Sequence, residues 1–167
     1  MRIRSSAAAL ALVAALAACG GGTGVAPSPA TPVPPDTARV ALAPVPYDMV
    51  LPAELAARLS VGPLTDEAFR SEVEAAGATA AVAVSYTAED GTVIGYMTAY
   101  LFPEDAFDAA QVPDAPPPYG VEVIREGGDV LSVWGPLDMP FPTDSADAAA
   151  WSALHELLSL PATYVRA

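Results

Sequence analysis

The clearest repeating pattern of apolar residues lies near the C-terminus of the chain. Residues that share one face of a helix recur there at spacings of three and four: Ala150, Trp151, Leu154, Leu157 and Leu158. Asp144, followed three residues later by Asp147, is a variant of the capping box that opens helices, and Pro161 follows the end of the pattern. The spacing predicts an amphipathic helix that buries this face.

Three shorter helical patterns precede it. Thr65 is a suitable N-cap for a helix that carries two acidic residues in its first turn and ends at Gly77. The apolar stripe of that helix consists of Phe69, Val73 and Ala76. We also expect a short helix over residues 51–59, with Pro52 at its first position, and a helical turn from Pro103 to Ala110.

Two hairpins are predicted from their turns. Asp90-Gly91 and Gly127-Gly128 provide the left-handed conformations that two-residue loops require. The first loop places Ser85 opposite Tyr96, Ala81 opposite Tyr100, Val82 opposite Ala99 and Val84 opposite Met97. The second places Ile124 opposite Leu131 and Val121 opposite Trp134. Aromatic and β-branched pairing across the strands favours both registers.

These elements predict a small α+β fold. We expect an antiparallel sheet of about four strands, with the C-terminal helix packed on the face that carries Val82 and Met97. In element order, the run "FRSEVEAAGATAAVAVSYTAEDG" is similar to the PsbP/Mog1-like sheet-and-helix domains.

A different pattern occupies the N-terminus. Arg2 and Arg4 precede an uncharged apolar run over residues 7–18, which is shorter than the roughly 20 residues that span a bilayer. Such a run is typical of a secretory signal. Leu16-Ala17-Ala18-Cys19 then resembles the lipobox of bacterial lipoproteins. The resemblance implies cleavage before Cys19 and acylation of its thiol; a free or intermolecularly paired thiol is the alternative.

Residues 20–46 are dominated by glycine and proline, so no regular element is expected there. The composition is typical of a spacer, although a ligand for a proline-binding domain has a similar composition. The chain thus divides into a lipoprotein signal peptide at 1–18, a lipidated cysteine and tether at 19–46, and a single globular domain at 47–167.

The charge of the chain excludes one class of partner. Five arginines and 20 acidic residues follow Cys19, which gives a net charge of −15, and there is no lysine. Such a body is repelled by nucleic acid, whose binding proteins need basic residues. The expected partners are the lipid bilayer, through acylated Cys19, and an envelope protein.

Candidate catalytic and metal-binding groups are few. His155 is the only histidine, with Ser152 and Ser159 at helical spacing, but no serine lies in a nucleophile turn. The acidic groups Glu104/Asp105/Asp108 and Asp138/Asp144/Asp147 do not match a calcium loop. No cofactor is expected.

Tyrosines offer a candidate contact surface. Tyr96 and Tyr100 fall on the sheet face opposite the last helix, and Tyr119 lies in a proline-rich loop. They either form a partner or ligand surface or, if the first helix covers them, belong to the core. We therefore expect a lipid-anchored, non-enzymatic interaction module on the extracytoplasmic face of a cell membrane. The alternative is an accessory module that binds a saccharide or a cation.

Overall fold

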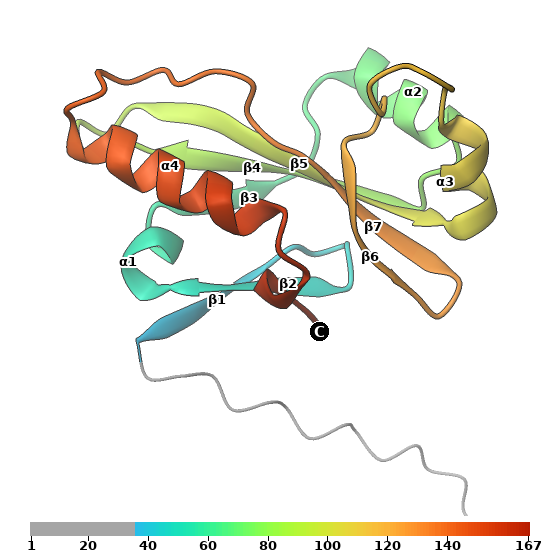
Figure 1. Ribbon diagram of the computed structural model, residues 1–167, viewed down its shortest axis with the longest axis horizontal. Helices are drawn as coiled ribbons and strands as arrows, with labels where there is room; N and C mark the ends of the chain where they lie inside the picture. The colour runs from blue at the N-terminus through green and yellow to red at the C-terminus, as the bar shows by residue number, and fades with distance from the viewer. Residues whose placement is uncertain (1–35) are drawn as a thin grey trace, which may run out of the picture. The chain divides into compact units, whose positions relative to one another are not determined.

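Eight strands and four α-helices make up residues 36–167, the part of the chain that the computed structural model describes (Figure 1). The strands are β1 (Thr37–Ala41), β2 (Tyr47–Pro52), β3 (Leu59–Gly62), β4 (Ala80–Thr87), β5 (Val93–Pro103), β6 (Val121–Glu126), β7 (Asp129–Trp134) and β8 (Tyr164–Arg166). The helices are α1 (Ala53–Ala56), α2 (Glu67–Ala75), α3 (Glu104–Ala110) and α4 (Ala146–Leu158), with a short 3₁₀ helix, η1 (Pro161–Thr163), before β8. The α+β class is confirmed.

The strands form two antiparallel sheets instead of the single sheet of about four strands expected. One sheet has the order β1-β2-β8, and the other has the order β3-β4-β5-β7-β6. Figure 1 shows β1 and β2 below the longer sheet in that view. The smaller sheet escaped prediction because β8 pairs with β2 across more than a hundred residues, without a local turn to indicate it.

The smaller sheet also changes two predicted boundaries. β1 lies inside residues 19–46, so the expectation of no regular element there is wrong for residues 37–41. The helix expected over residues 51–59 is reduced to α1, because β2 extends through Pro52 and β3 begins at Leu59.

Both hairpins form, and each contains one irregularity. Ala81 faces Tyr100 and Val84 faces Met97 as predicted, but a bulge then places Gly95, rather than Tyr96, opposite Ser85. The second hairpin keeps the pair Ile124 and Leu131, and its bulge places Val133 opposite Val121 in place of Trp134.

Both faces of the five-stranded sheet are covered. On one face, α4 and the smaller sheet pack on alternate residues of β4, β5 and β7, including Val82, Met97 and Val133. On the other face, α2, α3 and the segment before β6 enclose Tyr100, Phe102 and Val130. The C-terminal helix thus covers the face that the sequence predicts.

The N-caps of α2 and α4 are residues of the predicted type, but each lies one residue later in the chain than predicted. Asp66, not Thr65, caps α2 by accepting a hydrogen bond from the amide of Phe69. Ser145, not Asp144, caps α4 through the amide of Ala148. Gly77 adopts the positive φ of 95° that suits the residue after a helix C-cap.

Within residues 36–167, none of the helices is sufficiently long and apolar to cross a bilayer.

Candidate functional site

An apolar hollow lies between α4 and the adjoining ends of β6 and β7. We call it the Trp134 groove, and its volume is about 370 Å³. Its walls come from three segments, namely the proline loop before β6, the chain from Val133 to Leu137, and the C-terminal turns of α4. Polar side chains contribute little to the lining, which contains only His155 and Ser159 among them.

Glycine makes the close packing behind this groove feasible. Gly120 has φ of 76°, and a Cβ there would lie 2.1 Å from the carbonyl oxygen of Val133. Any other residue at this position would push the start of β6 away from β7. Gly135 is also tight, because an added Cβ would lie 3.1 Å from Cδ1 of Leu158. These contacts fix the proline loop and the end of β7 beside α4.

Strand alternation presents the aromatic wall of the groove. Val133 is buried in the core, so the next residue, Trp134, points outward and is 38% exposed. Leu137, in the loop that follows, is 85% exposed, the largest exposure among the large apolar side chains of residues 36–167. Trp134 and Leu137 therefore expose apolar surface directly beside the apolar hollow.

A second hollow continues from the first. We call it the acidic hollow; it has a volume of about 260 Å³ and shares Pro136, Leu137 and His155 with the Trp134 groove. Its lining adds two exposed carboxylates, Asp138 and Glu156. Together the hollows run along the exposed face of α4, apolar at one end and acidic at the other.

His155 lines both hollows and is exposed. No hydrogen bond joins it to Ser152 or Ser159 among residues 36–167.

The three tyrosines proposed as a contact surface are instead buried. Tyr96, Tyr100 and Tyr119 are 3%, 1% and 8% exposed. The expectation of an exposed tyrosine surface is therefore wrong, and the alternative, that the rings belong to the core, is confirmed.

Tyr96 is buried for a different reason from the other two. The bulge in β5 turns it to the α4 face, where its ring meets Trp151 edge-on at 4.7 Å. Tyr100 stays on the opposite face and contacts Tyr119 at a centroid distance of 5.9 Å. Burial raises the pKa of Tyr96, and it raises the pKa of Tyr100 to about 12.

Asp108 and Asp147, one from each acidic group considered for calcium, are engaged by arginines. Arg125 binds Asp108 and Glu122, and the hydrogen bond from Arg125 lowers the pKa of Asp108. Asp147 belongs to the network described next. Within residues 36–167, His, Cys, Asp and Glu side chains do not gather in a group that could hold a metal ion.

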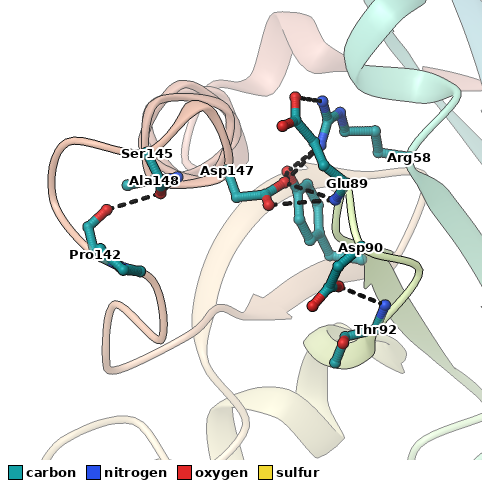
Figure 2. A network of polar contacts seen from close by, with 9 residues as sticks. Arg58, Glu89, Asp90, Thr92, Pro142, Ser145, Asp147 and Ala148 are labelled. Atoms are coloured by element: carbon teal, nitrogen blue, oxygen red, sulfur yellow. Dashed lines mark hydrogen bonds and ion pairs between the residues drawn. The ribbon is translucent and has the colours of Figure 1, made fainter.

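Asp147, in the first turn of α4, is the centre of a polar network (Figure 2). Its carboxylate accepts hydrogen bonds from Arg58 at 2.6 Å, from the hydroxyl of Tyr86 at 2.8 Å and from the amide of Glu89 at 3.2 Å. Burial, followed by the hydrogen bond to Asp147, raises the pKa of Tyr86. The network joins α4 to the segment before β3 and to the first hairpin, so it stabilises the fold instead of forming a reactive site.

Sequence patterns provide little indication of the groove. Trp134, Leu137 and His155 are separated along the chain, and only the packing of α4 beside the end of β7 brings them together. One local signal exists, since Leu137 lies between a proline and an aspartate and has no helix or strand pattern that would bury it.

Cys19, the predicted site of lipid attachment, lies outside the described residues. Comparisons of the chain with models of protein families, with curated proteins and with solved structures give no match. The resemblance to PsbP/Mog1-like domains therefore stays a prediction.

Proposed function

We propose that the protein is a cell-envelope lipoprotein, anchored through acylated Cys19 at the extracytoplasmic face of a membrane, whose folded domain is a non-enzymatic binding module. The single observation that carries the binding role is the Trp134 groove, an apolar hollow beside the 85% exposed Leu137. The lipobox-like sequence Leu16-Ala17-Ala18-Cys19 supports the anchor, and the glycine- and proline-rich residues that follow are suited to a spacer.

The groove favours an apolar ligand group over a saccharide. Sugar sites combine an aromatic face with several polar side chains that hydrogen-bond the hydroxyls, whereas only His155 and Ser159 are polar here. The ligand group that matches this lining is an aliphatic or aromatic side chain of a partner.

A neutral apolar dye tests the groove. N-phenyl-1-naphthylamine should gain fluorescence on binding the chain from residue 19 onward, with Cys19→Ser removing the acylation site. Trp134→Ser should weaken dye binding about fivefold, the loss expected when roughly 1 kcal/mol of apolar contact is removed. Val93→Ser is the matched control, because Val93 is 62% exposed and lines neither hollow. Equal dye binding by all three proteins would contradict a groove-centred function.

The anchor is tested separately in cells. The wild-type chain should sediment with membranes and partition into detergent, and the Cys19→Ser chain should be released. Membrane association that survives this substitution would exclude acylation of Cys19 as its cause.

A further inference from the structure

The charge around the groove is not balanced by the chain itself. Every arginine in the described residues pairs with a carboxylate of the same chain: Arg39, Arg58, Arg70, Arg125 and Arg166. None of them lines the Trp134 groove or the acidic hollow, and the chain has no lysine. The exposed carboxylates Asp138 and Glu156 have no ion-pair partner among residues 36–167, so they are available to a cation.

The length of the combined groove sets the size of a ligand segment. Ser152, His155, Glu156 and Ser159 line it at helical spacings of three and four. Seven residues of helix span about 10 Å. This length accommodates about three residues of extended chain or two turns of a helix. An occupant therefore presents a short series of side chains to the groove.

We infer that the groove binds a basic amphipathic segment of another protein. Aliphatic side chains of the segment fill the Trp134 groove, and a lysine or arginine lies beside Asp138 and Glu156 in the acidic hollow. This inference rests on the proposed function and adds the chemistry of the partner to it.

Charge excludes two competing occupants. A second copy of this chain carries the same net charge of −15, so the two acidic bodies repel each other. An anionic lipid surface is repelled for the same reason, because no basic patch on the described residues attracts it. A cationic segment is attracted both by the whole molecule and by the two carboxylates at the groove.

The experiment measures fluorescence anisotropy of labelled heptapeptides with the chain from residue 19 to 167 carrying Cys19→Ser. The probes are KLLKLLK, its acidic counterpart ELLELLE and the polar cationic peptide KSSKSSK. KLLKLLK should bind at least about tenfold more tightly than ELLELLE, because electrostatic complementarity selects the partner. KSSKSSK should also bind more weakly than KLLKLLK, because it has no apolar side chains for the groove.

Paired variants separate the groove from general attraction to an acidic protein. Leu137→Ser should weaken KLLKLLK binding about fivefold, and Val93→Ser should leave it unchanged. The double variant Asp138→Asn/Glu156→Gln should weaken binding about fivefold at low salt, as expected for two exposed ion pairs. Glu54→Gln/Glu72→Gln removes the same charge from exposed positions outside both hollows and should have a much smaller effect.

Three results would overturn the inference, and they are distinguishable. Equal weakening by the two double variants would show that only net charge matters. Equal binding of KLLKLLK and ELLELLE, with Leu137→Ser weakening both, would show an apolar site without preference for a cation, and the proposed function would stand. Absence of both peptide binding and dye binding would remove the proposed function as well.

Discussion

Asp147 is a single residue that links distant parts of the chain. Its side chain is 14% exposed and receives donors from two separate segments, namely Arg58 before β3, and Tyr86 with the amide of Glu89 in the first hairpin. Asp147→Asn keeps the shape of the side chain but removes the charge that these donors face. We expect the free energy of unfolding to fall by about 2 kcal/mol, the range for hydrogen bonds to a charged group.

Urea unfolding followed by circular dichroism measures this change. Glu156→Gln, on the exposed face of the same helix, is the control and should alter the free energy of unfolding by less than about 0.5 kcal/mol. If Asp147→Asn changes the free energy of unfolding no more than the control does, the network does not hold α4 to the first hairpin.

The cap of α4 gives a second prediction at this scale. Ser145 accepts the hydrogen bond from the amide of Ala148, whereas Asp144 beside it has no such contact. Ser145→Ala should therefore lower the free energy of unfolding by about 1 kcal/mol, the usual cost of removing a cap. Asp144→Ala should be nearly neutral. Thermal unfolding of both variants measures the two losses of stability. A larger loss for Asp144→Ala than for Ser145→Ala would assign the cap to Asp144.

The neighbouring caps illustrate the limit of sequence reasoning for single residues. Both Asp144 and Ser145 are good N-cap residues, and composition alone cannot rank them. Asp147, three residues after Asp144, fits a capping box in the sequence, yet its carboxylate instead binds Arg58, 89 residues away. Local chemistry predicts that a helix begins here. Only tertiary contacts decide which side chain caps the helix and which one binds Arg58.

At the scale of elements, the hairpins were predictable because their information is local. The turn residues fix the register near the loop, so Ile124 faces Leu131 as expected. The bulges were not predictable, and one of them has a large consequence. It places Tyr96 beside Trp151 on the α4 face, whereas strict alternation would put the ring on the opposite face.

β1 could not be predicted from the composition of its segment. It lies in a proline-rich stretch, yet it pairs with β2 along its whole length. The turn between the two strands buries Leu42 and Val45, which are 0% and 2% exposed. The prediction that the globular domain starts at residue 47 therefore omits part of the core.

A chain beginning at Tyr47 tests this boundary. Compared with a chain beginning at Asp36, it loses both buried side chains and the pairing partner of β2. Its free energy of unfolding should be lower by at least about 3 kcal/mol, since full burial of each aliphatic side chain contributes roughly 1.5–3 kcal/mol. Equal urea midpoints for the two chains would show that β1 is dispensable.

At the scale of the whole molecule, the candidate site arises from long-range packing. Trp134 ends one strand, Leu137 lies in the loop that follows it, and His155 lies on a helix. Each residue has an ordinary local context, so no motif in the sequence marks the groove. Composition did predict the acidity of the molecule, and the structure shows that the arginines are engaged within the chain, which leaves the groove with a negative rim.

The burial of all six tyrosines gives the molecule a definite response to alkaline pH. Every one has a raised pKa with burial as the largest cause, and the pKa values of Tyr47 and Tyr100 rise to about 12. In the unfolded chain tyrosine titrates near pH 10. Between about pH 10 and 12 the unfolded state therefore binds fewer protons than the folded state, and stability falls as the pH rises.

The expected loss is about 1.4 kcal/mol per pH unit for each tyrosine that stays neutral in the fold, while stability below about pH 9 is unaffected by these groups. Urea unfolding at several pH values between about 9 and 11.5 measures the slope, and absorbance near 295 nm reports tyrosinate. Tyr47→Phe should reduce the slope, because it removes one such group together with its hydrogen bond to Glu126. Tyrosinate that forms near pH 10 while the circular dichroism of the fold persists would contradict the buried arrangement of the rings.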